Sequence, residues 1–135
     1  LLATINRELC ETAIHGMFVT MTCGLLDQST GEVQLANAGH EPPLLHARDG
    51  SFTPIPASAP PLGIVPLVAG DDGIRKETFR LDGGTLYIFT DGVTEGELTD
   101  GSQLGTDGFK RIIREQRSLL FQVAARKMMP IYMAT

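Results

Sequence analysis

The feature that most constrains the fold is the stretch of residues 86–95, which reads LYIFTDGVTE. Its first four residues are apolar or aromatic without a polar break, a pattern typical of a strand buried on both faces. Thr90 then leads into Asp91 and Gly92. This order predicts a carboxylate at the end of a core strand, held on a stiff element and open to solvent, as a metal or phosphate site requires. Because Asp-Gly is also a common tight-turn dipeptide, a plain hairpin turn is the alternative for this stretch taken alone.

Composition favours one folded domain that does not bind nucleic acid. The 135 residues are 42% hydrophobic and 20% charged, which is enough to bury a core. There are 16 Asp and Glu against 11 Lys and Arg, and no cluster of basic residues of the kind that a phosphate backbone requires. No apolar run approaches the ~20 residues of a membrane span, and no leader pattern follows Leu1. We therefore expect a cytoplasmic protein with no membrane insertion.

The two cysteines, Cys10 and Cys23, form no Cys-x-x-Cys motif and have no histidine at ligand spacing. We expect both to be free thiols in or near the core. A single disulfide between them is the alternative.

The first half of the chain predicts one helix and two hairpins. Apolar residues recur at helical spacing over residues 2–15, and polar residues, Asn6 among them, fill the other side. Strand formers in residues 17–27 and alternation in residues 33–38 flank a short turn, which predicts an antiparallel pair of strands. A second hairpin is expected over residues 43–55, with its turn at Arg48-Asp49-Gly50.

The next segment predicts a long loop and a third hairpin. Five prolines and three glycines fall within residues 54–73, a composition that disrupts helices and sheet ladders, so we expect an ordered loop there. Residues 74–81 predict a strand with a polar face, and Asp82-Gly83-Gly84 turns it directly into the strand at residues 85–90.

The last third predicts a polar loop over residues 92–105 and then a helix that ends before Pro130. Asp107 is the candidate N-cap of this helix. Its expected apolar face consists of Phe109, Ile112, Ile113, Leu120, Val123 and Ala124. The order of elements, a helix, five to seven strands and a helix, predicts an α+β fold with antiparallel sheets.

Three stretches stand where a strand ends or a loop meets the sheet: residues 37–43 (NAGHEPP), 61–64 (PLGI) and 89–95 (FTDGVTE). Separately, each is explained by a turn glycine, a proline loop or a solvated acidic patch. In this order and spacing they resemble the metal-dependent protein phosphatase (PPM) superfamily, in its bacterial branch related to the stage II sporulation phosphatase and the stress-response serine phosphatases. The resemblance runs from about Phe18 to about Ile113.

The resemblance implies an antiparallel β-sandwich flanked by helices and a protein serine/threonine phosphatase. Its substrate would be phosphoserine or phosphothreonine on a regulatory protein, such as an anti-sigma-factor antagonist. Asp91 matches a catalytic carboxylate that binds one of two Mn²⁺ or Mg²⁺ ions, and Gly92 matches the turn beside the ion. Asn37, Gly39 and His40 match the edge of the substrate site or of an accessory metal site. For His40, a loop imidazole hydrogen-bonded to backbone is the alternative.

The sequence also departs from the family pattern. It contains neither the early Gly-Asp-x-Tyr/Phe-Asp motif nor the late Asp-Asp-Ile/Val-Thr strand, and Gly70-Asp71-Asp72-Gly73 is interpreted as a turn. We therefore expect residues 1–135 to form a single, partial phosphatase domain without these two motifs. The alternative function is a catalytically inactive phosphatase-like module that binds a partner or dimerises. Open sheet edges in such a partial domain predict self-association, including a swapped homodimer.

Overall fold

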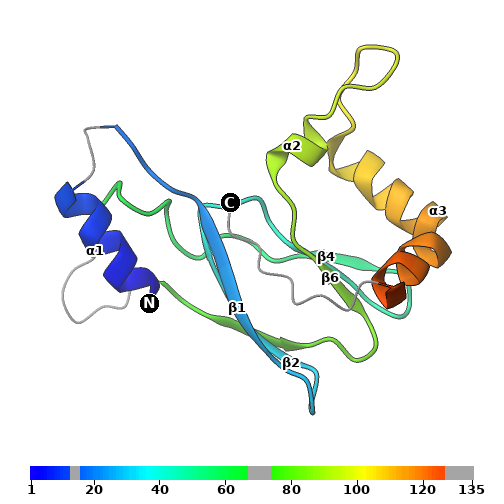
Figure 1. Ribbon diagram of the computed structural model, residues 1–135, viewed down its shortest axis with the longest axis horizontal. Helices are drawn as coiled ribbons and strands as arrows, with labels where there is room; N and C mark the ends of the chain where they lie inside the picture. The colour runs from blue at the N-terminus through cyan, green and yellow to red at the C-terminus, as the bar shows by residue number, and fades with distance from the viewer. Residues whose placement is uncertain (13–15, 67–73, 127–135) are drawn as a thin grey trace. The chain divides into compact units, whose positions relative to one another are not determined.

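A computed structural model describes the backbone of residues 1–12, 16–66 and 74–126, and the side chains of these ranges through residue 115. The chain divides into two compact units, the second beginning at Gly92, and each is described by itself. In chain order the elements are α1 (Leu2–Thr12), β1 (Met21–Asp27), β2 (Glu32–Ala38), β3 (Leu44–His46), β4 (Phe52–Pro54), β5 (Glu77–Arg80), β6 (Thr85–Tyr87), α2 (Asp91–Thr94) and α3 (Gly105–Arg126) (Figure 1).

The first unit contains two three-stranded antiparallel sheets, with strand orders β1-β2-β5 and β4-β3-β6. The first two predicted hairpins are confirmed. Strand β1 pairs with β2 from Met21 opposite Ala38 to Asp27 opposite Glu32, and β3 pairs with β4. The predicted α+β class with antiparallel sheets is therefore confirmed as well.

The third predicted hairpin is wrong, because β5 and β6 lie in different sheets. Strand β5 pairs with β2, and β6 pairs with β3. The turn that joins them is present, since the N–H of Gly84 donates to the carbonyl of Leu81 at 2.6 Å, but it carries the chain from one sheet to the other. This arrangement lets Phe79 of β5 and Leu86 of β6 contribute to the same apolar cluster from two sheets.

Two clusters of apolar residues form the core of this unit. One contains Val33, Leu35 and Ile55, with Leu45, Phe79, Leu81 and Leu86 packed against it, so it joins the two sheets. The other contains Leu2 of α1 together with Ala36, Ala38 and Leu62, with Ile5 and Leu9 packed against it. The predicted apolar face of the first helix is therefore confirmed at Leu2, Ile5 and Leu9.

The expectation that residues 86–89 are buried on both faces is wrong for most of them. Leu86 and Tyr87 are partly exposed, Ile88 is 37% exposed, and only Phe89 is buried, at 6%. The reason is position: β6 is an outer strand of its sheet and pairs with β3 alone among the described strands. The apolar run therefore covers an outer strand of the sheet, and the residue of the run that is buried, Phe89, follows the end of that strand.

Two predictions for residues 91–126 are wrong, the loop after Asp91 and the N-cap of the last helix. The segment after Asp91 is not entirely loop, because α2 forms a single helical turn there. Helix α3 begins at Gly105, so Asp107 is not its N-cap; it lies in the first turn, with a carboxylate oxygen 3.6 Å from Nζ of Lys110. On the expected apolar face Ile113 is buried, but Ile112 is 40% exposed. The side chains of Leu120, Val123 and Ala124, Pro130 and the predicted turn at Gly70-Asp71-Asp72-Gly73 lie outside the described residues.

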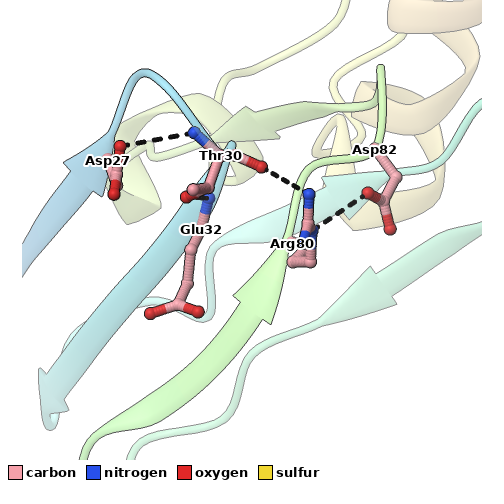
Figure 2. Close-up of polar contacts among 5 residues, drawn as sticks. All are labelled: Asp27, Thr30, Glu32, Arg80 and Asp82. Atoms are coloured by element: carbon pink, nitrogen blue, oxygen red, sulfur yellow. Dashed lines mark hydrogen bonds and ion pairs between the residues drawn. The ribbon is translucent and has the colours of Figure 1, made fainter.

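A polar network ties β5 to the turn between β1 and β2 (Figure 2). Oδ1 of Asp27 accepts from the N–H groups of Ser29 and Thr30 at 2.8 and 3.3 Å, which closes the turn. Nη2 of Arg80 donates to the carbonyl of Thr30 at 2.8 Å, and its Nε lies 3.4 Å from Oδ1 of Asp82. The first hairpin turn is thus held from both its own residues and the neighbouring strand.

Three exposed turn carboxylates predict a loss of stability in acid. Hydrogen bonds from Ser29 lower the pKa of Asp27 below its usual 3.8, and bonds from Ser51 and Ser102 do the same for the pKa of Asp49 and of Asp100. A lowered pKa in the folded state means that the stabilisation is complete above pH 3.8 and is lost as the pH falls through the lowered value. We expect the free energy of unfolding, measured with urea, to decrease across this window. Asp27→Asn should make that decrease shallower; an unchanged slope would contradict the role of this carboxylate.

Candidate functional site

The end of β2 and the residues after it form a tightly bonded loop. Asn37 is buried, at 2% exposed, and its side-chain amide bonds both backbone groups of His40. Oδ1 of Asn37 accepts from the His40 N–H at 2.8 Å, and Nδ2 donates to the His40 carbonyl at 3.1 Å. The carbonyl of Asn37 accepts the N–H groups of Ser58 and Ala59 at 2.9 and 3.2 Å. Asn37 therefore fixes the backbone that carries His40.

Gly39 joins this loop to the proline-containing motif. Its φ is +66°, a conformation that side chains with a Cβ rarely adopt. A Cβ at this position would lie 2.5 Å from two ring carbons of Pro61. The structure thus brings together two of the three motifs that the sequence singled out, at Gly39 and Pro61, and gives a physical reason for glycine between Ala38 and His40.

The imidazole of His40 interacts with a side chain that sequence reasoning did not select. Nδ1 of His40 lies 3.2 Å from Oγ1 of Thr20, just before β1, and both residues are partly exposed. Nδ1 is therefore paired with a side-chain hydroxyl. The alternative drawn from the sequence was a hydrogen bond between the imidazole and a backbone group. Nothing in the local sequence distinguishes Thr20 from the other strand formers around it, so this pair becomes visible only through the fold.

A second residue that the sequence did not select is Asn6, which was expected on the polar side of α1. It is buried instead, at 3% exposed. Its Oδ1 accepts the N–H of Gly63 at 2.9 Å, and its Nδ2 donates to the carbonyl of Val65 at 3.1 Å. A single polar residue on the buried side of a helix therefore holds the segment that follows Leu62. The sequence signal for it is one asparagine beside Leu2 and Ile5, which by itself has no specificity.

Asp91 and Gly92 occupy the first two positions of α2. Both are exposed, and they follow the buried Phe89 and the partly exposed Thr90. The expected order is therefore present: an exposed carboxylate follows a buried apolar side chain, with one threonine between them. The chain continues as a helical turn, however, and not as the tight hairpin turn that was the alternative for this stretch.

The described residues match a divalent cation in the kind of donor but not in the number. An exposed aspartate oxygen is the ligand that Mg²⁺ and Mn²⁺ prefer, and these ions take about six such ligands. Within residues 1–12, 16–66 and 74–115, no group of three or more His, Cys, Asp and Glu side chains is placed to hold a metal ion. The Asp91 carboxylate can supply one or two of these oxygens, and the described residues place no cluster of acidic, histidine or cysteine side chains around it.

The two cysteines and the remaining described histidine have contacts within the fold. Cys10 and Cys23 are free thiols, as expected, and Sγ of Cys10 lies 4.0 Å from Oδ1 of Asn6. His46 is buried in β3, where its ring stacks on Phe52 with centroids 4.2 Å apart. Among the described helices, none is long and apolar enough to cross a membrane.

Comparison with solved structures defines the class of fold. The chain is similar to the structure of the RsbU and RsbW domains of Rv1364c from Mycobacterium tuberculosis, with 26% identity, a TM-score of 0.60, and coverage of 90% of this chain and 33% of that one. It also shares the fold of the phosphatase domain of the cell-fate determinant SpoIIE from Bacillus subtilis, presoaked with manganese. That match has 18% identity, a TM-score of 0.53, and coverage of 98% of this chain and 60% of that one. The described fold corresponds to part of the SpoIIE-type metal-dependent phosphatase domain.

Sequence comparison gives the family. The stage II sporulation protein E (SpoIIE) family matches residues 1–130, and the chain belongs to that family. A curated relative is Protein IcfG from Synechocystis sp. (strain ATCC 27184 / PCC 6803 / Kazusa), which is 32% identical over 85 residues, or 60% of this chain and 13% of IcfG. The chain thus spans a small part of that relative and less than two thirds of each solved chain. The resemblance to the bacterial phosphatases drawn from the three motifs is confirmed.

Proposed function

We propose that this chain is part of a protein serine/threonine phosphatase domain that hydrolyses phosphoserine or phosphothreonine on a regulatory protein. The observation that carries the proposal is the match of the SpoIIE family to residues 1–130, which includes Asp91 and the loop from Asn37 to His40. The exposed position of Asp91 after the buried Phe89 supports it, because a metal-binding carboxylate must reach solvent from a stiff support.

In this proposal Asp91 binds Mn²⁺ or Mg²⁺ through its carboxylate, and Gly92 provides the adjoining backbone. Two such ions, when bound in a complete domain, would supply an activated water and would neutralise charge on the phosphoryl oxygens. Asn37, Gly39 and His40 form the edge of the substrate site. The tight bonding of the Asn37 side chain to His40 supports this role, since a rigid loop holds a ligand-binding group at a fixed place.

The proposed partner is a phosphorylated regulator in a sigma-factor pathway, such as an anti-sigma-factor antagonist, in the cytoplasm. The similarity to a protein that contains RsbU and RsbW domains supports this choice. Residues 1–135 would form one partial phosphatase domain without the early Gly-Asp and late Asp-Asp motifs. Self-association through the outer strands is part of the same proposal, since Leu25 and Leu26 of the outer strand β1 are exposed.

The test is hydrolysis of p-nitrophenyl phosphate by the chain with and without Mn²⁺. We expect Asp91→Ala to lower the Mn²⁺-dependent rate by roughly tenfold or more, because loss of a residue that only supports a metal ligand already costs about 10–100-fold. Asp107→Ala is the matched control, because Asp107 is also an exposed aspartate in the first turn of a helix. It should retain the wild-type rate. Equal rates for the wild type and Asp91→Ala would rule out the enzymatic proposal for this chain and leave the inactive, partner-binding module.

A further inference from the structure

The contacts around His40 determine more than its position. Its backbone is held at both polar groups by Asn37, and the preceding residue, Gly39, is packed against Pro61. These contacts restrain the backbone of His40 and not its imidazole ring. The ring is restrained in turn by Thr20, whose Oγ1 lies 3.2 Å from Nδ1. A histidine held in this way has a defined ring orientation. Its hydrogen-bonding character then depends on which ring nitrogen carries the proton.

The donors and acceptors of Thr20 and His40 determine which ring nitrogen carries the proton. A threonine hydroxyl has one proton to donate, and neutral imidazole has one donor nitrogen and one acceptor nitrogen. In the described part of the chain, the contact with Nδ1 is the one hydrogen bond of the Thr20 hydroxyl. If Nδ1 carried the proton, Thr20 would accept it and its own proton would have no protein acceptor there. If Thr20 donates to Nδ1, both groups are satisfied by the same bond.

We infer that the Thr20 hydroxyl donates to Nδ1 of His40 and thereby holds the imidazole in the tautomer that carries its proton on Nε2. The partly exposed ring then offers an N–H donor and not a lone pair. Thr20 is a positioning residue in this arrangement, since it acts through His40. The Asn37 side chain contributes by keeping the His40 backbone at the distance from Thr20 that the bond requires.

The tautomer determines the class of ligand. An Nε2–H group donates to an oxyanion, whereas a metal ion binds the unprotonated nitrogen. His40 is therefore assigned to a phosphoryl oxygen and not to an accessory metal ion. This ligand assignment rests on the proposed phosphatase function, but the tautomer itself does not.

The tautomer is tested by long-range ¹H–¹⁵N correlation spectra of the uniformly labelled chain at neutral pH. The His40 signals are assigned by their loss in His40→Gln. We expect the wild type to show Nε2–H alone, Thr20→Val to show an increased fraction of Nδ1–H, and Thr20→Ser, which restores the hydroxyl, to return to the wild-type pattern. A wild-type ring protonated on Nδ1, or identical spectra for the wild type and Thr20→Val, would overturn the inference. Dispersed backbone spectra of each variant show that it is folded.

The ligand is tested by adding inorganic phosphate and, separately, Mg²⁺ to the same labelled protein. We expect phosphate to shift the His40 Nε2 signal, Thr20→Val to reduce that shift, and Mg²⁺ alone to leave the signal in place. A shift with Mg²⁺ alone, or none with phosphate, would overturn the assignment to an oxyanion. Failure of the Asp91 experiment would remove the enzymatic role without changing the His40 tautomer, so the two proposals fail separately.

Discussion

Gly39→Ala is expected to lower the free energy of unfolding by about 2–4 kcal/mol. Part of this loss comes from the backbone, because a left-handed conformation costs an L-residue about 1–2 kcal/mol. The rest comes from packing, since the added methyl would lie 2.5 Å from the Pro61 ring and 2.7 Å from its backbone nitrogen. Overpacking of this kind typically costs about 1–3 kcal/mol. Urea unfolding followed by circular dichroism measures the change.

Gly31→Ala is the matched control for this prediction. Gly31 also has a positive φ, of +72°, but a Cβ there would meet no atom within 4 Å. Alanine at this position carries the backbone cost alone, about 1–2 kcal/mol. The difference between the two variants isolates the contact between Gly39 and Pro61. Equal losses would mean that this contact relaxes at little cost and that the two motifs are not locked together.

Leu35→Ala is expected to cost about 2–5 kcal/mol, the range for removal of a leucine side chain from a packed core. Leu35 is 2% exposed and lies in the apolar cluster that joins the two sheets. Few side chains can move into the space it leaves, because the neighbouring strands are fixed by their ladders. The same urea experiment measures the loss.

Leu25→Ala provides the comparison, with the same chemical change one strand away. Leu25 lies in β1, opposite Gln34, and is 74% exposed. Its truncation should change the free energy of unfolding of the monomer, measured at low protein concentration, by no more than about 0.5 kcal/mol. Similar losses for the two variants would contradict the assignment of Leu35 to the packed face of the first sheet and of Leu25 to its exposed face.

The elements predicted well from the sequence are those defined by nearby residues. The first hairpin follows from a short turn between two strand-forming runs. Its strands pair without interruption from Met21 opposite Ala38 to Asp27 opposite Glu32. Helix α1 follows from the spacing of Leu2, Ile5 and Leu9. In each case the information lies within about two turns of helix or one pair of strands, which is the range over which a hydrophobic period is visible.

The pairings of β5 and β6 were not predictable in the same way. Asp82-Gly83-Gly84 has the composition of a hairpin turn, and the turn forms, but the partner of each strand is set by packing far away in the sequence. The apolar run 86–89 gave a similar error, since the same letters describe a central strand and an outer strand that is followed by a buried residue, Phe89. Local patterns specify that a strand exists, and the neighbours decide where it belongs.

The candidate site shows the same division. The family motifs identified Asp91 and the loop around Gly39, because these residues form continuous stretches of sequence. Thr20 and Asn6 had no such signal, since Thr20 makes one hydrogen bond and Asn6 makes two to segments distant in the sequence. Side chains that support a site from a neighbouring element become apparent only when the elements are placed in space.

The passage from β5 to β6 between sheets also bears on how the chain acquires its structure. The two early hairpins involve residues close in sequence, so each can close within microseconds. Strands β5 and β6 join partners that precede the long proline-rich segment, and such distant pairings raise the contact order and slow the search. The rate-limiting step of folding is therefore expected to be the pairing of β5 with β2 and of β6 with β3. These pairings complete the two sheets and bury the leucines that lie between them.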